Sequence, residues 1–251
     1  MVATRRRDSK LPDEVSSNIT WITKSLADVA FNDLTQIDVL VHLAATGVSP
    51  QKATWEQLFQ VNVLDSISIW KRAIEAGIRR IVVCGSCHEY GRSGDDYEFI
   101  PVDALLQPVT AYAASKAAAT QAALALAVEE SIEMVLLRPF NCYGEGQHAS
   151  NLWPRLRDAA LAGDDFAMTS GDQIRDFVLV DRVASAFLDS CETNELTPGT
   201  PIIKNVGSGE PKSVAEFAID WWRHWNAKGN LKIGAIPKNK NEVHRFVPLL
   251  P

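Results

Sequence analysis

The stretch Ile37–Ala45, which reads Ile-Asp-Val-Leu-Val-His-Leu-Ala-Ala, is a short and nearly continuous apolar run that ends in small residues. A run of this length is typical of a strand that is buried on both faces, as in a parallel sheet that leads to a ligand site. Next along the chain, residues 54–76 have helical spacing with Gly77 as a stop, and Arg79–Cys84 forms a second buried strand. The residues expected on the inward face of this helix are Leu58, Val61, Leu64, Ile69 and Ala73.

The alternation of strand and helix continues along the rest of the chain. The expected helices cover 112–130, 152–162, 181–191 and 213–225, and the expected strands cover 132–137, 201–206 and 231–236. Elements that alternate at this spacing predict an α/β fold with a doubly wound parallel sheet. After Pro139 the sequence becomes richer in Gly, Asn and Asp, which we interpret as a small α/β lobe interleaved with the first.

The composition excludes several classes of protein. The 251 residues are 46% hydrophobic and 22% charged, which suits one α/β domain or a domain with a lobe. The net charge of −6 argues against a nucleic-acid-binding face, which requires clustered basic residues. No stretch approaches the ~20 apolar residues of a membrane span, and Met1–Arg5 lacks the apolar core of a secretory signal. We therefore expect a cytoplasmic protein that binds neither nucleic acid nor membranes.

Cys84 and Cys87 form a Cys-x-x-Cys pair, which could be a redox pair or half of a zinc site. The chain has no second pair, and the spacer lies at a strand end instead of opening a helix. We favour a structural interpretation and expect no metal site.

Tyr112 and Lys116 lie four residues apart on the helix expected over 112–130, so they share one face. An adjacent ammonium stabilises a phenolate, which predicts that Lys116 lowers the pKa of Tyr112 toward working pH. Such a phenol can give a proton to a developing alkoxide or take one from an alcohol. Ser86 follows the strand over 79–84, and its hydroxyl could sit beside the phenol. The alternative is an ordinary amphipathic helix face, because Tyr-x-x-x-Lys alone is a weak pattern.

His42, Ser86 and Asn141 each follow the end of a predicted strand. Ligands of doubly wound sheets bind beyond the carboxyl ends of the strands, so these residues are expected around one crevice. We interpret His42 as a packed structural histidine. His88 could be a general acid or a residue that lines the pocket.

Three tryptophans of the helix over 213–225 allow two interpretations. Trp221, Trp222 and Trp225 could form a platform on which a sugar ring stacks. Their spacing fits a buried helix face better, so we expect them in the core.

Seven motifs occur in the order found in one known family. They are Val41-His42-Leu43-Ala44-Ala45, Asn62 within Gln60-Val61-Asn62-Val63, Cys84-Gly85-Ser86-Cys87-His88-Glu89-Tyr90-Gly91, Tyr112-x-x-x-Lys116, Leu137-Arg138-Pro139-Phe140-Asn141-Cys142-Tyr143-Gly144, Arg175-Asp176-Phe177-Val178 and Asn205-Val206-Gly207-Ser208-Gly209. From about Ile19 to Phe246 the chain therefore resembles the extended short-chain dehydrogenase/reductase family of nucleotide-sugar epimerases, dehydratases and reductases. Each motif is weak alone, and their agreement in register makes the resemblance specific.

The resemblance implies roles for the catalytic and coenzyme-binding residues. Tyr112 would be the acid/base, Lys116 would bind the coenzyme ribose, and Ser86 would hydrogen bond to the substrate oxygen. Hydride would pass between a sugar carbon and NADP or NAD. Asn62 resembles the polar residue that distorts the helix beneath Lys116. The implied coenzyme-binding residues are Arg5, Arg6, Leu43, Ala44, Ala45, Asn62, Tyr112, Lys116 and Pro139.

The resemblance further implies a nucleoside diphosphate sugar as substrate and a homodimer built on the helices over 54–76 and 112–130. Asn141 and Arg175 resemble diphosphate ligands, and a guanidinium fork suits phosphate oxygens. The implied substrate-binding residues are Ser86, Cys87, His88, Asn141 and Arg175. Because the 4,6-dehydratases carry Glu at the position of His88, a dehydratase is disfavoured. The string Gly85–Gly91 is more similar to 4-ketosugar reductases that act on 6-deoxyhexoses, and an epimerase stays open.

The resemblance also divides the chain and identifies a missing unit. Residues 1–140 would form an incomplete dinucleotide-binding domain, and 141–251 mostly a substrate-binding lobe, with about 177–207 returning to the Rossmann-like sheet. The family begins with a strand, a Gly-rich turn and a helix that cradle the coenzyme pyrophosphate. Gly47 is the only glycine among the first fifty residues, so we expect this β-Gly-loop-α unit to be lacking. Met1–Arg6 resembles the second strand and its Arg pair, which favours NADP.

The missing unit would leave a gap of about 10 Å beside the strand over 39–41. Each buried backbone group left unpaired there costs ~1–3 kcal/mol. Three explanations are open: residues 1–36 shift inward, they are loose, or the chain is a fragment of a longer gene product. We favour the third. Near residues 241–246, Asn239 or Lys238 replaces an Arg that would contact the diphosphate. We expect weak coenzyme binding, and the alternative function is a non-catalytic relic that binds a sugar nucleotide or a partner.

Overall fold

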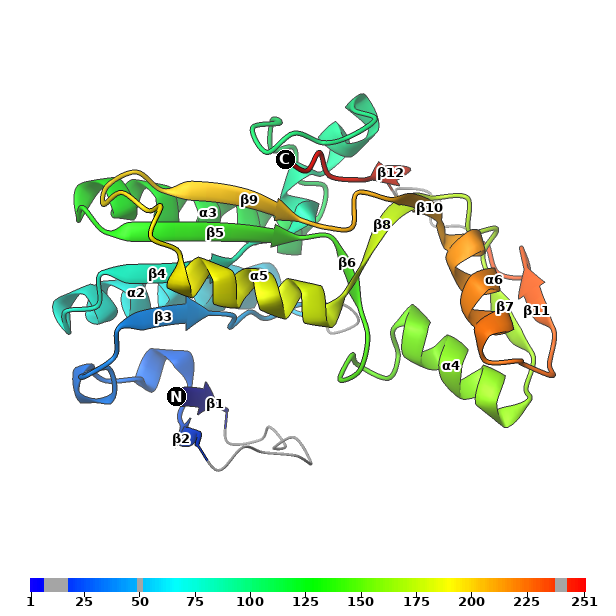
Figure 1. Cartoon of the computed structure of the whole chain (residues 1–251), viewed down its shortest axis with the longest axis horizontal. Helices are drawn as coiled ribbons and strands as arrows, with labels where there is room; N and C mark the ends of the chain where they lie inside the picture. The colour runs from blue at the N-terminus through cyan, green and yellow to red at the C-terminus, as the bar shows by residue number, and fades with distance from the viewer. Residues whose placement is uncertain (7–17, 49–51, 238–242) are drawn as a thin grey trace.

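The computed structural model describes residues 1–6, 18–48, 52–237 and 243–251. Its centre is a four-stranded parallel sheet with the order β3-β4-β5-β9, shown in Figure 1. The strands are β3 (Val39–His42), β4 (Arg80–Cys84), β5 (Glu133–Pro139) and β9 (Ile202–Val206). Because all pairings are parallel, the carboxyl ends of these strands meet at one edge of the sheet.

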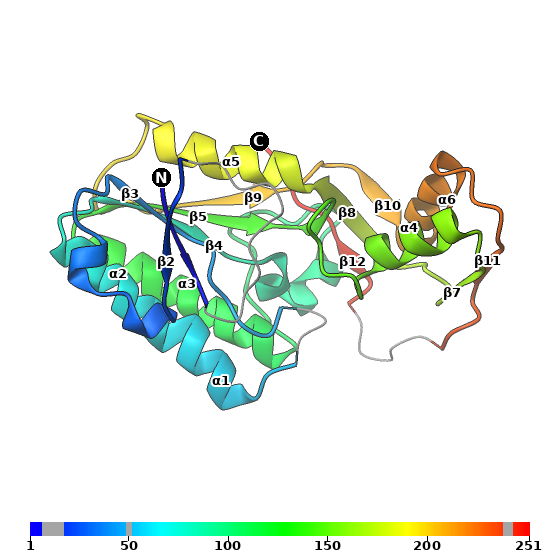
Figure 2. The ribbon, with the colours of Figure 1, turned by 90° about the horizontal axis from the view of Figure 1, so that it is seen from below.

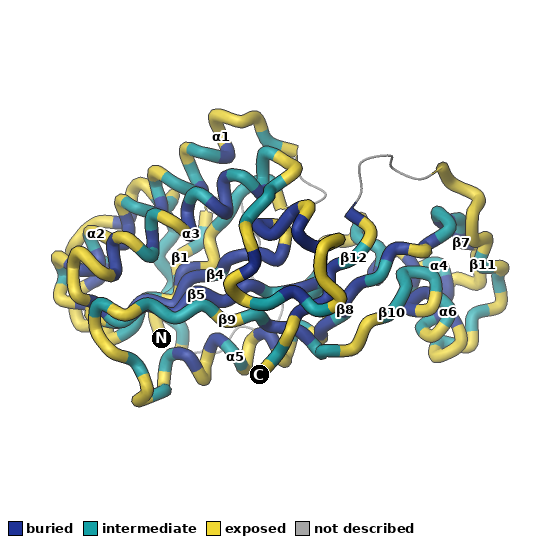
Figure 3. The backbone as a smooth tube through the Cα atoms, turned by 90° about the horizontal axis from the view of Figure 1, so that it is seen from above, coloured by how far each residue is buried: buried dark blue, intermediate teal, exposed yellow. Residues whose placement is uncertain are grey.

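Helices cover both faces of this sheet, as a doubly wound fold requires. In Figure 2, α1 (Trp55–Phe59), α2 (Ser66–Glu75) and α3 (Ala111–Glu129) lie on one side and α5 (Val180–Glu192) on the other. One apolar cluster joins β4 and β5 to α2 and α3, and another joins the same strands to α5. Figure 3 shows that β4 and β5 are mostly buried, whereas the helices alternate buried and exposed residues. The predicted Rossmann-like class is confirmed.

The first two strands stand apart from the central sheet. β1 (Val2–Arg5) and β2 (Thr20–Thr23) pair in parallel with each other and form a separate two-stranded sheet. Two short turns, η1 (Leu26–Asp28) and η2 (Phe31–Asp33), lead from β2 to β3. Among the described residues, β3 pairs with β4 alone, so it is an edge strand. In Figure 2, β1 and β2 run across the direction of the central strands.

A smaller lobe extends beyond the carboxyl edge of the sheet (Figure 1). β8 (Ile174–Leu179) pairs with β6 (Asn141–Tyr143), β10 (Pro211–Ser213) and β12 (Arg245–Phe246). The helices α4 (Leu152–Ala162) and α6 (Val214–His224) pack with β7 (Phe166–Met168) and β11 (Leu231–Ile233) around a third apolar cluster. Two turns, η4 (Cys87–Tyr90) and η5 (Arg92–Asp96), complete the elements between β4 and α3.

The structure corrects the prediction in three places. The helix expected over 54–76 is interrupted by a π-helical segment, η3 (Gln60–Asp65), and its extra residue per turn shifts the apolar face. Leu64, expected to point inward, is consequently 54% exposed. The strand expected over 231–236 is shorter and is followed by β12. The strands β2, β6, β7, β8 and β10 were not predicted, because most of them are only three or four residues long and carry too little periodicity.

Candidate active site

Ser86 is fixed by a short turn at the end of β4. It is the N-cap residue of η4, with φ −159° and ψ 140°, and its hydroxyl accepts a hydrogen bond from the His88 amide at 3.2 Å. Its own amide donates to Glu89 Oε1 at 2.8 Å, which closes a capping box. The backbone on both sides of Ser86 is therefore held, and its side chain is positioned at the carboxyl edge of the sheet.

Tyr112 meets Ser86 at this edge. It is the second residue of α3, whose N-cap Thr110 accepts from the Ala113 amide at 3.2 Å. Burial raises the pKa of Tyr112 well above its ordinary value, and the nearby Ser86 side chain opposes this rise. The expected lowering of this pKa by Lys116 is therefore wrong, because desolvation outweighs any favourable charge.

Lys116 is buried and points at the end of β4. Its Nζ donates to the Cys84 carbonyl oxygen at 2.6 Å, which fixes the ammonium beside the strand that carries Ser86. Asn62 lies in η3, in the neighbouring helix, and its Nδ2 donates to Ser115 Oγ at 2.9 Å. Asn62 Oδ1 also accepts from the Thr46 amide at 2.8 Å, and its Nδ2 donates to the Thr46 carbonyl oxygen at 3.1 Å. The polar residue that accompanies the helix distortion thus ties the loop after β3 to the residue before Lys116.

A buried network that the sequence reasoning missed supports the Ser86 turn. The Glu89 carboxylate accepts from Thr120 Oγ1 at 2.8 Å and from Arg138 Nε at 2.9 Å, in addition to the Ser86 amide. Arg138 Nη1 also donates to the Tyr90 hydroxyl at 3.0 Å. Burial raises the pKa of Glu89, and the positive charge of Arg138 opposes this. The available signal was Arg138, a charged residue that directly follows the apolar run Met134–Leu137.

His42 is a packed structural histidine, as expected. Its Nε2 lies 3.1 Å from Ser66 Oγ, and its ring meets Trp70 edge-on with 5.4 Å between centroids. Burial, aided by the charge of Lys116, lowers the pKa of His42 to about 3. The ring is therefore neutral at physiological pH and adds no charge beside Lys116.

Three of the residues implied in substrate binding gather around Phe246, which the sequence reasoning did not select. Cys87 belongs to the same buried cluster as Phe246, the exposed His88 meets its ring edge-on at 5.5 Å, and the Arg175 guanidinium lies 5.4 Å from its centroid. Arg175 also donates to the carbonyl oxygens of His244 and Val243, each at 2.9 Å. β12 thus brings these three positions together.

The remaining residues of this set are held differently. Asn141 Nδ2 donates to the Asp176 carbonyl oxygen at 3.2 Å, which places it between β6 and β8. Cys87 is 2% exposed, and burial raises the pKa of its thiol to about 12. Burial also raises the pKa of Cys84. Since neither thiol is ionised at neutral pH, the structural interpretation of Cys-x-x-Cys is the one that fits.

The positions implied in coenzyme binding fall into two groups. Leu43, Ala44 and Ala45 follow β3, and Pro139 ends β5, so these four lie at the carboxyl edge of the sheet. An added Cβ on Gly47 would lie 3.6 Å from Tyr112 Cδ2, which places the loop after β3 beside the phenol. The second group is separate, because Arg5 ends β1 and its Nε donates to Thr23 Oγ1 at 3.2 Å, and Arg6 follows it. Lys238 and Asn239 lie outside the described residues.

Within residues 1–6, 18–48, 52–237 and 243–251, no three His, Cys, Asp or Glu side chains cluster in a way that could hold a metal ion. In the same part of the chain, every helix is too short or too polar to cross a membrane.

Comparison with known proteins places this geometry in context. A model of the "NAD dependent epimerase/dehydratase family" matches residues 2–207. The dTDP-D-glucose 4,6-dehydratase of Mus musculus is 29% identical over 220 residues, which cover 82% of this chain and 58% of that protein. The UDP-glucose 4-epimerase of Neisseria meningitidis is 26% identical over 205 residues, covering 72% of this chain and 59% of that protein. The chain thus spans less than two thirds of the length of these relatives.

Solved structures resemble the chain over nearly its whole length. MoeE5 in complex with UDP-glucuronic acid and NAD superposes with a TM-score of 0.85 and 26% identity, covering 99% of this chain and 81% of that one. A UDP-N-acetylglucosamine 4-epimerase from Methanobrevibacter ruminantium M1 gives a TM-score of 0.84 at 21% identity, covering 93% and 75%. The second likeness shows the fold alone.

Proposed function

The chain belongs to the NAD-dependent epimerase/dehydratase family, and we propose that it is a nucleotide-sugar oxidoreductase or epimerase, most similar to a 4-keto-6-deoxyhexose reductase. The observation that carries the proposal is that Ser86 acts on the Tyr112 phenol, while the Lys116 ammonium is fixed at the end of β4, the strand that leads to Ser86. A proton donor, a second hydroxyl and a fixed cation at one sheet edge suit a carbonyl or carbinol carbon.

The residues of the chain supply proton transfer and electrostatic stabilisation. A bound nicotinamide coenzyme would supply or accept the hydride. Tyr112 keeps its proton at neutral pH because burial raises its pKa, so it can donate that proton to the oxygen of a ketosugar. Ser86 would hydrogen bond to the same oxygen, and one such donor contributes ~10²–10³ in rate.

The turn after β4 supports a reductase over a dehydratase. Loss of water from a sugar needs an acid that faces the ring, and the position where the dehydratases carry Glu holds His88 here. The neighbouring carboxylate, Glu89, is fully buried and is bound by Arg138, Thr120 and the Ser86 amide. Glu89 therefore faces the core and has no route to a ligand in the crevice.

The residues fit a dinucleotide coenzyme at one end only. Tyr112, Lys116 and the loop after β3 suit the nicotinamide and its ribose. Before β3, the described residues contain no Gly-rich turn that opens a helix toward a pyrophosphate, since Gly47 follows β3. We propose that the 251-residue chain binds NADPH or NADH weakly, with Arg5 and Arg6 favouring NADPH.

This partial fit favours a second candidate function. A non-catalytic relic would keep the sugar-nucleotide crevice and use it to bind a sugar nucleotide or a protein partner. The separation of β1 and β2 from the central sheet supports this alternative, because the coenzyme side of the crevice is built from that region.

One assay separates the two functions. The chain is mixed with NADPH and a 4-keto nucleoside diphosphate 6-deoxyhexose, and absorbance is followed for wild type, Tyr112→Phe and Ser86→Ala. Turnover that Tyr112→Phe abolishes supports the enzyme, while Tyr97→Phe, a change at a half-exposed tyrosine, serves as the matched control. If there is no turnover but calorimetry shows that the sugar nucleotide binds, the result supports the non-catalytic relic. Tight binding of NADPH in calorimetry contradicts the proposal that the chain binds the coenzyme weakly.

We also propose a homodimer through α1, α2 and α3. Leu64 on η3, between α1 and α2, and Val128 on α3 are 54% and 59% exposed, which leaves apolar surface for a second copy. Sedimentation of wild type and Leu64→Arg tests this, and an unchanged monomeric mass in both contradicts it.

A further inference from the structure

A cavity of about 500 Å³ lies in the smaller lobe, between β6, β8, β10 and α6. None of the residues that line it belongs to the Ser86, Tyr112 and Lys116 group. Its size lies in the range of cavities that hold small organic ligands, about 300–1,000 Å³. The cavity is therefore large enough for a small ligand and lies apart from the Ser86, Tyr112 and Lys116 group.

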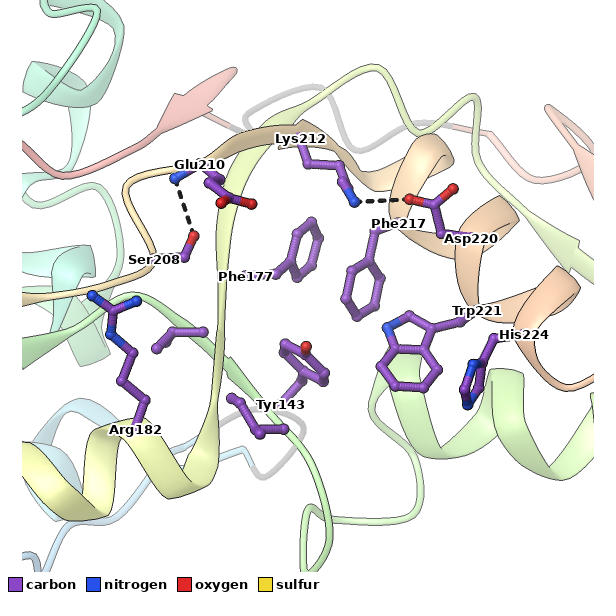
Figure 4. A pocket seen from close by; sticks show the side chains of 12 residues that line it. Tyr143, Phe177, Arg182, Ser208, Glu210, Lys212, Phe217, Asp220, Trp221 and His224 are labelled. Atoms are coloured by element: carbon purple, nitrogen blue, oxygen red, sulfur yellow. Dashed lines mark hydrogen bonds and ion pairs between the residues drawn. The ribbon is translucent and has the colours of Figure 1, made fainter.

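Aromatic rings from three elements form one side of this cavity (Figure 4). Phe177 and Phe217 are stacked with 3.8 Å between centroids and 11° between planes. Tyr143 meets Phe217 edge-on at 5.1 Å and Trp221 at 5.8 Å. Since each ring is held by its neighbours, a ligand that packs on them costs little side-chain ordering. Trp221, expected in the core, is half-buried and contributes to this wall, whereas Trp222 is buried as expected.

The rest of the cavity carries balanced charges. Lys212 Nζ and Asp220 Oδ2 form an ion pair at 2.7 Å on one rim. Arg182 and Glu210 lie on the side opposite Trp221 in Figure 4, near Ser208. Two cations and two anions line the cavity, so the charges of these four side chains sum to zero. They therefore offer both hydrogen-bond donors and acceptors beside the apolar wall.

We propose that this cavity binds a neutral saccharide unit. A pyranose has an apolar face of C–H groups that packs on aromatic rings and a rim of hydroxyls that both donate and accept. The aromatic wall and the mixed rim match these two features. A phosphate-bearing ligand would meet Asp220 and Glu210 as well as Lys212 and Arg182, so its charge would find no net attraction. A purely apolar ligand would remove four charged groups from water without replacing their hydrogen bonds.

The proposal is tested by saturation-transfer difference NMR, with irradiation of the aromatic protons of the protein. The probes are maltotriose, cellotriose, chitotriose and mannotriose at millimolar concentration, with glucose 6-phosphate as the charged comparison. We expect transfer to at least one trisaccharide and a dissociation constant weakened about tenfold in Arg182→Ala/Asp220→Ala, because two hydrogen-bonding groups are lost. Both positions are exposed, so the double variant is expected to fold.

Two controls locate the site. Arg223→Ala removes an exposed charge from the same helix without touching the cavity, and it should leave transfer unchanged. Tyr112→Phe should also leave transfer unchanged, which separates this cavity from the proposed active site. Absence of transfer to all four trisaccharides overturns the proposal. Transfer that survives Arg182→Ala/Asp220→Ala at full strength, or tighter binding of glucose 6-phosphate than of any trisaccharide, also overturns it.

Discussion

Replacing Arg138 by Met tests whether the buried ion pair with Glu89 holds the Ser86 turn. Arg138 and Glu89 are 2% and 0% exposed, and their side chains meet at 2.9 Å. Methionine keeps the length and apolar contacts of the arginine stem but removes the charge. The Glu89 carboxylate then keeps the Ser86 amide and Thr120 as donors, while the Tyr90 hydroxyl and the Val102 carbonyl each lose one.

The expected cost follows from these contacts. Leaving one member of a buried ion pair uncompensated costs about 3–5 kcal/mol of unfolding free energy. Removing both charges in Glu89→Gln/Arg138→Met should cost less than the two single changes added together, since no charge is left buried. Burial raises the pKa of Glu89, and Arg138 opposes this, so the single variant raises it further. Because the raised carboxyl takes up a proton more readily when folded, the loss caused by Arg138→Met should shrink as pH falls from 7 toward 5.

Urea unfolding followed by circular dichroism and by tryptophan fluorescence measures all four proteins of the cycle at both pH values. The turnover assay is run in parallel. Glu89 accepts a hydrogen bond from the Ser86 amide, so loss of this hydrogen bond should lower kcat more than it raises KM. A loss below about 1 kcal/mol for Arg138→Met, or strict additivity in the cycle, would refute the buried-pair reasoning.

Three further predictions concern single side chains. The pKa of His42 is lowered to about 3, so its contribution to stability is complete above about pH 6.5 and falls by ~2 kcal/mol at pH 5. His42→Gln should flatten this pH dependence of the unfolding free energy, measured by urea titration. An unchanged slope contradicts the prediction. Asn62→Leu leaves the Thr46 backbone and the Ser115 hydroxyl short of partners, so thermal and urea unfolding should show a loss of ~1–3 kcal/mol; no loss would show that η3 does not need the amide. Cys87, buried with a thiol pKa of about 12, should react with a thiol reagent at pH 8 only after unfolding, and rapid labelling of the native chain at this position argues against its burial.

Local patterns in the sequence were sufficient for the main elements of the sheet. The apolar runs around Val39–His42 and Arg80–Cys84 predict strands because a strand buried on both faces needs apolar residues at successive positions. The expected burial holds for the centre of β4 but is wrong for β3, an edge strand in which Val41 is 38% exposed. The Ala-rich helix and the capped helix after Ser213 were predicted for similar local reasons, and Ser213 does cap α6. Strands of three residues such as β6 carry too little periodicity to be recognised.

The sequence by itself determined which residues could meet at the carboxyl edge of the sheet. Ser86 follows the end of β4, and Tyr112 lies at the start of α3. Local turn and cap chemistry set both positions, so both residues face the same edge of the sheet. Only the tertiary structure decided what those groups are chemically. Desolvation raises the pKa of Tyr112, and Glu89 and Arg138 form a buried pair, because burial depends on residues from several distant segments. The aromatic cavity between β6, β8 and α6 has the same origin, since segments far apart in sequence contribute its walls.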